Sequence, residues 1–331
     1  MLLNLQQHQG RTYSNSCFYL PNGFQSLLNY QYFFIFLLVV YMTTLFSNGF
    51  LMAIILFVDN LHTPKYIYIA VFMLSVVDIS YSSSFIPRYV LSFAFNFNFI
   101  PYEACLAQLF FVHYFCAMES ISLAVLAYDR LMAICFPLHC SSIHTNKRMI
   151  LIIGITWMVA FMCVITAVIF MTRLSFCKSV IINSYFCDHG PMYVLACNDN
   201  SANRTTSYIF IAIMIVIPLI FIIITYTCII AAVLKIASAS GRLKTFKTCT
   251  THLILVAIFY LPLLLMYFII IWANDKIDTD ARILNTSLSA TLPPLLNPIV
   301  YTLKTNEITE QIKKMFFRSG AQFWSMTLTI Q

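Results

Sequence analysis

One apolar stretch, residues 105–135, carries the side chains best suited to binding or proton chemistry. His113, Cys116 and Ser120 recur at three- and four-residue steps, so they share one face of the predicted helix. His113, Cys116 and Glu119 are also residue types that ligate metals. Their steps turn progressively around the helix, however, and the sequence offers no second cluster to face them. The pattern therefore favours the wall of a binding pocket over a metal site.

Two acidic residues, Asp78 and Glu119, fall inside apolar stretches. A carboxylate in the middle of a membrane is costly and is functional by default. Together with Asn48 and Asn297, these acids could share a proton or bind a small cation such as sodium. The alternative is a structural acid that is kept neutral by protonation. We predict no other cofactor.

An adjacent acid and base, Asp129 and Arg130, close the same stretch. Cys105 and Arg130 are 25 residues apart, which is roughly 37 Å of helix and about one bilayer thickness. The pair could be a surface ion pair of little energetic value, but its place beside a cavity favours a switch. The intramembrane His, Cys and acidic residues form no set of nucleophile, base and orienting group, so we predict no enzyme.

The chain that positions these residues is 331 residues long, 60% hydrophobic and only 9% charged, against about 25% charged residues in a soluble domain. Seven apolar stretches are long enough for spanning helices. They cover approximately residues 30–58, 65–90, 105–135, 147–172, 206–236, 248–272 and 283–303. The sequence therefore predicts an all-α membrane protein, a seven-helix bundle within the lipid bilayer.

Basic residues indicate the orientation, because they accumulate in the inner segments of membrane proteins. With the N-terminus outside, the inner segments hold most of the 19 basic residues. The net charge of +7 then belongs to the inner face and requires no nucleic-acid partner. The predicted parts are a polar, poorly ordered extracellular segment (1–29), the bundle (30–303) and a cytoplasmic tail (304–331). Residues 305–320 have the pattern of an amphipathic helix on the inner leaflet.

Five of the eleven cysteines fall in outer segments, where disulfides persist. They are Cys17, Cys105, Cys177, Cys187 and Cys197. Five is an odd number, so one cysteine is left over, and we expect it to be Cys17. Sequons occur at Asn203, close to the membrane, and at Asn285, inside the last apolar stretch, but not in residues 1–29.

Prolines interrupt three of the predicted spanning helices. They are Pro218, two turns before Tyr226, then Pro262, and finally Pro293, Pro294 and Pro298. Proline frees backbone groups and kinks a helix, which indicates hinges rather than a passive anchor. A transporter would also combine broken helices with intramembrane polar residues, but the seven spans show no internal duplication. A channel would need a ring or filter motif, which we do not find.

The chain resembles class A (rhodopsin-like) G-protein-coupled receptors, and among them the odorant receptors, in five ordered motifs. These are LHTPKYIYI (61–69), LAYDRLMAICFPL (126–138), the triple-cysteine loop, KTFKTCTTHL (244–253) and PLLNPIVY (294–301). The resemblance extends over about residues 30–318. It implies an odorant pocket in the outer half, a G-protein cleft in the inner half, and a stimulatory olfactory G protein that raises cAMP. The implied location is the plasma membrane, on the cilia of olfactory sensory neurons.

The resemblance also implies roles for individual residues. Two disulfides, Cys105–Cys187 and Cys177–Cys197, would form outside. The polar core would contain Asn48, Asp78, Glu119 and Asn297, and the inner switch Asp129, Arg130, Tyr226, His252 and Tyr301. The pocket wall would comprise His113, Cys116, Ser120, Phe210, Ile211, Met214, Ile215, Tyr260, Leu264, Tyr267 and the loop after Cys187.

Some positions depart from the family pattern. Leu131 replaces the tyrosine of DRY, Leu261 replaces the glycine of the span-6 motif, and Lys65 replaces the methionine of LHTPMY. The usual N-terminal sequon is missing, which bears on glycosylation and surface delivery.

The expected ligand is small, largely apolar, and neutral or weakly polar. The matched wall of the fifth span is apolar, and Ile271 offers no cation to a carboxylate. His113 or Tyr267 would then supply the directional hydrogen bond. The alternative is a class A receptor for a small metabolite that is not an odorant.

Overall fold

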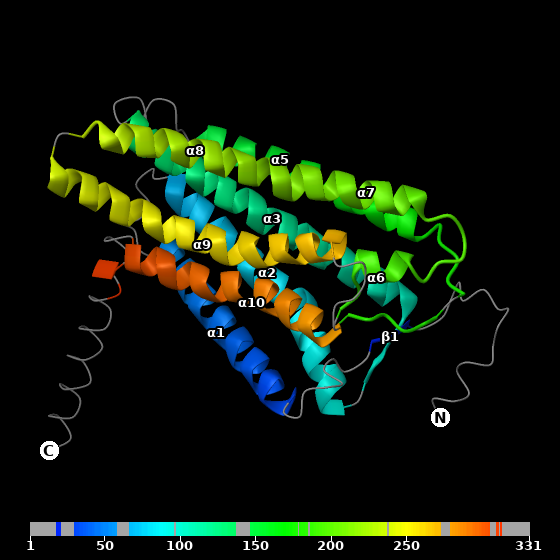
Figure 1. Ribbon diagram of the computed structural model, residues 1–331. Coiled ribbons are helices and arrows are strands. Elements are labelled where there is room, and N and C mark those ends of the chain that lie inside the picture. The colour runs from blue at the N-terminus through cyan, green and yellow to red at the C-terminus, as the bar shows by residue number, and fades with distance from the viewer. Residues whose placement is uncertain are drawn as a thin grey trace, which may run out of the picture.

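The protein is seen here as a computed structural model, in which long helices run side by side (Figure 1). The structure describes residues 18–20, 30–57, 66–95, 97–136, 146–177, 179–184, 186–236, 238–272, 279–304, 309, 310 and 312. Cys17, motif residues 61–65, most of the predicted amphipathic helix and the side chains of Tyr267 and Ile271 lie outside this description.

Five helical segments are long and apolar enough to cross a membrane, by length and composition, within the described residues. They are α1 (Tyr30–Phe57), α2 (Tyr66–Phe95), α3 (Tyr102–Cys135), α5 (Asn146–Met171) and the continuous run α7 (Ser201–Ile211), η3 (Ala212–Val216) and α8 (Ile217–Leu234). Two more long helices, α9 (Ala239–Trp272) and α10 (Thr279–Lys304), pack against each other, and α9 contains the shorter apolar segment His252–Leu265. The helical class and five of the predicted spans are thus confirmed.

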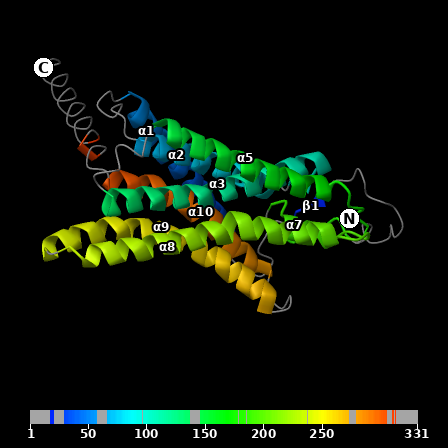
Figure 2. The ribbon, with the colours of Figure 1, turned by 90° about the horizontal axis from the view of Figure 1, so that it is seen from above.

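Helix α3 lies in the middle of the bundle in both views (Figures 1 and 2). It packs against α2, α5, α8 and α9. Its buried side chains include Met118, Glu119, Ser120 and Leu123, each with essentially no exposed surface. Glu119 and Ser120, two of the polar residues singled out in the sequence, therefore project into the interior of the bundle and not toward lipid.

One end of the bundle, which we call the disulfide end, is covered by short strands and the loop between α5 and α7. Strand β1 (Phe18–Tyr19) pairs antiparallel with β2 (Phe99–Ile100), and Tyr19 also forms a parallel bridge with Ile181. Phe18 and Leu20 are 3% and 4% exposed. The prediction that residues 1–29 are poorly ordered is therefore wrong for residues 18–20, because two alternate apolar side chains are buried there.

A π-helical turn, η3, lies within the long segment from α7 to α8. The backbone N–H of Ile217 donates to the carbonyl of Ala212, five residues back. Pro218 follows immediately and cannot donate to the carbonyl of Met214, its partner in a regular α-helix. The turn thus aims the Met214 carbonyl at α3. Pro262 lies inside α9, and three prolines lie inside α10.

Candidate functional site

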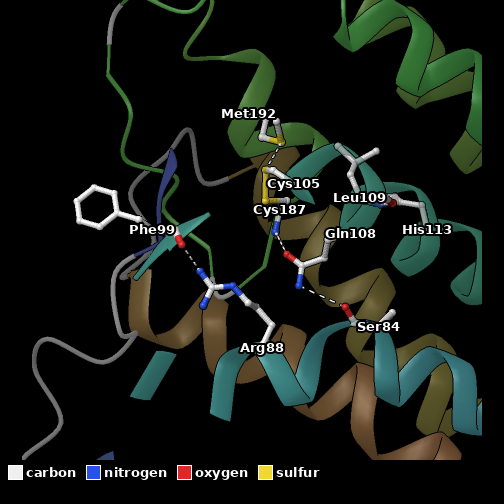
Figure 3. The surroundings of a disulfide bond; sticks show 9 residues. All are labelled: Ser84, Arg88, Phe99, Cys105, Gln108, Leu109, His113, Cys187 and Met192. Atoms are coloured by element: carbon white, nitrogen blue, oxygen red, sulfur yellow. Dashed lines mark hydrogen bonds between the residues drawn. A yellow bond between two sulfur atoms is a disulfide. The ribbon is translucent and has the colours of Figure 1, made fainter. Parts of the chain in front are cut away.

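The loop between α5 and α7 is fastened to α3 at the disulfide end. A disulfide joins Cys105 on α3 to Cys187, with the two Cα atoms 5.4 Å apart. One turn further along α3, the Gln108 side chain accepts the Cys187 N–H through Oε1 at 3.0 Å. The same side chain donates from Nε2 to the carbonyl of Ser84 on α2 at 3.3 Å (Figure 3). Gln108 therefore fixes the loop against two helices.

A second disulfide, Cys177–Cys197, closes the loop on itself, with the Cα atoms 5.9 Å apart. Asn198 strengthens this closure, because its side chain accepts the Ser175 N–H and donates to the Arg173 carbonyl, both at 2.9 Å. Asp188 and His189 directly follow Cys187, between the two crosslinks.

Figure 3 also shows Arg88, which holds the turn before α3. Its guanidinium donates to the carbonyls of Phe97 and Phe99, each at 2.6 Å. Its centre lies 5.3 Å from the Phe97 ring. This basic residue therefore has a structural role at the rim and is committed to backbone carbonyls.

Beyond Gln108, a second polar side chain of α3, His113, also meets the loop. Its Nδ1 lies 2.9 Å from the carbonyl of Leu109, and its Nε2 lies 3.4 Å from Oδ1 of Asp188. The ring packs edge-to-face on Phe210 of α7, with centroids 5.8 Å apart. The structure therefore joins α3, the loop and α7 at this position.

His189 lies next to this group and is buried, with 6% of its surface exposed. Its Nδ1 lies 2.6 Å from the Ser207 hydroxyl on α7. The pKa of His189 is lowered to about 4, mainly by burial and also by the neighbouring His113, while Asp188 opposes this shift. At neutral pH the His189 imidazole is therefore uncharged.

Two turns below His113, a chain of hydroxyl groups crosses the bundle. Ser120 donates to the Met214 carbonyl at 2.6 Å, the carbonyl that Pro218 cannot reach. Ser120 Oγ also lies 2.7 Å from the Tyr260 hydroxyl. Because Ser120 has one hydrogen and gives it to Met214, Tyr260 donates to Ser120. Three helices, α3, α9 and the η3 turn, are therefore joined at one point.

The predicted pocket residues fall into two groups in space. His113 contacts Phe210, and Ser120 binds both Met214 and Tyr260. Cys116, between these groups on α3, is partly buried. Ile211 is also partly buried and Ile215 is 1% exposed, whereas Leu264 is 38% exposed, unlike the other named wall residues on helices whose side chains the structure describes.

A buried polar cluster lies deeper, between α2, α3 and α10. Asn297 donates from Nδ2 to Asp78 Oδ1 at 2.9 Å and to Glu119 Oε1 at 2.7 Å. Asn48 on α1 donates to the Pro294 carbonyl at 3.0 Å. That carbonyl has lost its regular helical donor, since residue 298 is also proline. A sequence argument alone does not show this match of amide to proline-freed carbonyl.

Several oxygen atoms of this cluster are buried without a hydrogen-bond partner among the described residues. They are Asp78 Oδ2, Glu119 Oε2, Asn48 Oδ1 and Asn297 Oδ1. Carboxylate and amide oxygens are the ligands that hard cations prefer. These oxygen ligands would fit a small cation or a shared proton, which stays a prediction.

The other end of α3 carries the predicted switch. Asp129 Oδ2 and Arg130 Nη2 are 3.2 Å apart. Across the bundle, the Tyr226 hydroxyl lies 2.8 Å from His252 Nδ1, and the two rings stack with centroids 5.7 Å apart. Tyr301 on α10 is 6% exposed. These side chains lie where α3, α8, α9 and α10 approach the end opposite the disulfides.

The two sequon asparagines are buried or bound within the bundle. Asn203 is 2% exposed, and Asn285 donates from α10 to the Pro262 carbonyl of α9 at 3.0 Å. In this conformation neither amide is available to carry a glycan.

A shallow, open depression lies between α2, α3 and α5. Its lining includes Ala70, Ile121, Ile153, Thr156 and Trp157. None of the predicted ligand residues contributes to it, so we do not assign it to the ligand.

Three features of the site escape sequence reasoning. Gln108 and Asp188 are ordinary polar residues near cysteines, and only the folded loop shows what they contact. Strand β1 is two residues long, and the alternation of Phe18, Tyr19 and Leu20 is the single local signal for it.

Comparison with known proteins agrees with the resemblance found in the sequence. The family model for olfactory receptors matches residues 37–319. Putative olfactory receptor 1F12P of Homo sapiens is 33% identical over 314 residues, which are 95% of this chain and 92% of that protein. Olfactory receptor 1M1 of Mus musculus is 34% identical over 281 residues, 85% of this chain and 88% of the relative. Olfactory receptor 6C75 of Homo sapiens is 34% identical over 284 residues, 85% and 89% of the two chains.

The family match, the apolar helices and the disulfide-tied loop agree with one another. Together they describe a multi-pass membrane protein of the odorant-type G-protein-coupled receptor class. The chain belongs to the olfactory receptor family, whose members are signalling receptors and not enzymes.

Proposed function

We propose that this receptor binds a small, largely apolar odorant at the disulfide end and activates a stimulatory olfactory G protein, which raises cAMP. In this proposal all seven long helices span the plasma membrane of sensory cilia, with the N-terminus and the disulfides outside. The orientation is supported by the disulfides, which persist in oxidising surroundings. It is also supported by the excess of basic residues in the segments at the other end.

The observation that carries the proposal is the hydroxyl chain from Tyr260 through Ser120 to Met214. It lies between the His113–Phe210 contact and the buried polar cluster, and it couples three helices that must move relative to one another in a helical switch. Burial of apolar ligand surface near Phe210 would supply affinity, at about 25 cal/mol per Å² before the costs of association. A ligand shifts the equilibrium only if its contacts differ between two states.

The end opposite the disulfides would report that shift. In the resting arrangement Arg130 is paired with Asp129, and Tyr226 with His252. We propose that activation moves the end of α9 opposite the disulfides outward. Arg130 of α3 then leaves Asp129 and meets Tyr226 and the G protein. Pro262, within α9, supplies a hinge for this movement.

The buried polar cluster would hold a sodium ion or a shared proton in the resting state. Its support is the set of four buried oxygens described above. One positive charge would stabilise Asp78 and Glu119 at this depth, where two ionised carboxylates repel each other.

Nucleotide exchange on an added stimulatory G protein tests the function directly. Membranes that contain the receptor and a mixed odorant panel should show ligand-stimulated exchange, and Arg130→Ala should abolish it at equal receptor level. Exchange that is undiminished in Arg130→Ala would contradict the switch. Ion flux or solute uptake in vesicles without G protein would instead favour a channel or a transporter.

A further inference from the structure

The hydrogen bond between His113 and the backbone fixes the state of its ring. Nδ1 lies 2.9 Å from the Leu109 carbonyl (Figure 3), and a carbonyl oxygen can only accept. The hydrogen of the neutral imidazole is therefore on Nδ1. Nε2 of that ring carries a lone pair and is an acceptor.

This lone pair faces a second acceptor. Asp188 Oδ1 lies 3.4 Å from Nε2, and an ionised carboxylate has no hydrogen to offer. Two acceptors at this distance repel each other unless a hydrogen lies between them. It can come from a proton on the ring, which makes an ion pair, or from a donor group of a ligand.

The pair is accessible and not sealed in the core. The side chains of His113 and Asp188 are 23% and 31% exposed. The neighbouring His189 is neutral and directs Nδ1 to Ser207, so it adds no charge. Phe210 packs edge-to-face with the His113 ring, so an apolar side chain lies beside the pair.

We propose that the His113–Asp188 pair binds the polar end of the ligand, that this end is a hydrogen-bond donor, and that an alkylammonium group fits best. An ammonium group can donate one N–H to Nε2 and another to Oδ1, and its charge complements the carboxylate. An alcohol has one hydroxyl hydrogen and can donate to only one of the two acceptors. A carboxylate ligand has no hydrogen to donate and would place a third acceptor beside them.

The proposal rests on the proposed function only in placing the ligand at this end. It replaces the neutral or weakly polar ligand that the sequence suggested with a cationic one, because that expectation considered Ile271 and not Asp188. The two can fail separately. A bound amine that stimulates no nucleotide exchange would count against the proposed function alone.

The test is the midpoint of thermal unfolding of the purified full-length receptor in lipid nanodiscs. Alkylamines from butyl to decyl are compared with the alcohols and carboxylates of equal chain length at neutral pH. Amines should raise the midpoint most, alcohols less, and carboxylates not at all. In Asp188→Asn, which keeps the shape of the side chain, the amine concentration needed for the same shift should rise roughly tenfold or more.

Two further variants complete the design. Asp199→Asn removes a carboxylate from the same loop that binds the Ser201 N–H and hydroxyl at 2.9 and 2.7 Å, and it should leave the amine effect unchanged. His113→Phe removes the Nε2 acceptor but keeps a ring beside Phe210, and it should weaken amine binding, which keeps the test decisive if Asp188→Asn does not fold. The proposal is overturned if no amine stabilises the receptor, if carboxylates stabilise it equally, or if both pocket variants keep the amine effect.

Discussion

Ser120 donates its hydroxyl hydrogen to the backbone carbonyl of Met214 at 2.6 Å. In a regular α-helix that carbonyl would receive the N–H of residue 218, which here is proline. Asn48 has the same relationship with the Pro294 carbonyl, four residues before Pro298. Each of these two carbonyls lacks its regular backbone N–H partner, because that residue is proline. A polar side chain of α1 or α3 donates the missing hydrogen bond instead. This allows the bent helices to stay buried in the bundle.

The first prediction concerns the asymmetry of the hydroxyl chain. Ser120→Ala leaves both the Met214 carbonyl and the Tyr260 hydroxyl short of a partner, whereas Tyr260→Phe removes one donor and leaves Ser120 bound to Met214. We expect Ser120→Ala to cost about 1–3 kcal/mol of stability and Tyr260→Phe about 1 kcal/mol. The measurement is the midpoint of thermal unfolding, with Ser122→Ala, two residues further along α3, as the control. A larger loss in Tyr260→Phe would refute the assigned direction of the bonds.

The second prediction concerns the buried acids. If a sodium ion neutralises Asp78 and Glu119, replacing potassium by sodium at constant ionic strength should raise the unfolding midpoint of the receptor. Asp78→Asn removes one negative charge and keeps a partner for Asn297, so it should abolish the difference between the two ions. An equal response of both proteins to sodium would argue against an ion here. No response in either would favour the shared proton.

The sequence predicts the features that depend on local pattern. Long apolar runs predict the helices, and the acids Asp78 and Glu119 inside such runs predict a buried polar site. It does not predict which carbonyl Ser120 or Asn48 will meet, because that depends on which helices adjoin and how a π-turn rotates one of them. Nor does it predict the contact between His113 and Asp188, since two disulfides and Gln108 first have to place the loop.

The third prediction tests the N-terminal strand as part of the fold. Phe18 packs edge-to-face on Phe176 with ring centroids 5.1 Å apart and is 3% exposed. Phe18→Ala should lower the free energy of unfolding by about 3 kcal/mol, since it leaves a cavity in the apolar core at the disulfide end. Tyr19→Ala is the matched control, because Tyr19 is only partly buried and contacts Phe99 instead. If both variants lose the same small amount, residues 18–20 do not stabilise the disulfide end.

The last prediction is a pH dependence that originates in His189. Burial lowers the pKa of His189 to about 4, whereas an unfolded histidine has a pKa of about 6.5. Between pH 6.5 and pH 4, His189 is protonated in the unfolded chain but stays neutral in the folded receptor. The free energy of unfolding therefore falls as the pH falls toward 4. The limiting slope is about 1.4 kcal/mol per pH unit, and above pH 6.5 this contribution is constant.

His189→Gln removes the titrating group and retains an amide that can bind Ser207. The unfolding midpoints of the receptor and the variant, measured from pH 7.5 down to pH 4.5, should therefore converge as the pH falls, because only the receptor with His189 loses this term. Other groups titrate in both proteins and cancel in the comparison. Parallel curves over the whole range would show that His189 binds its proton equally well in the folded and unfolded states, and would refute its burial as a neutral residue.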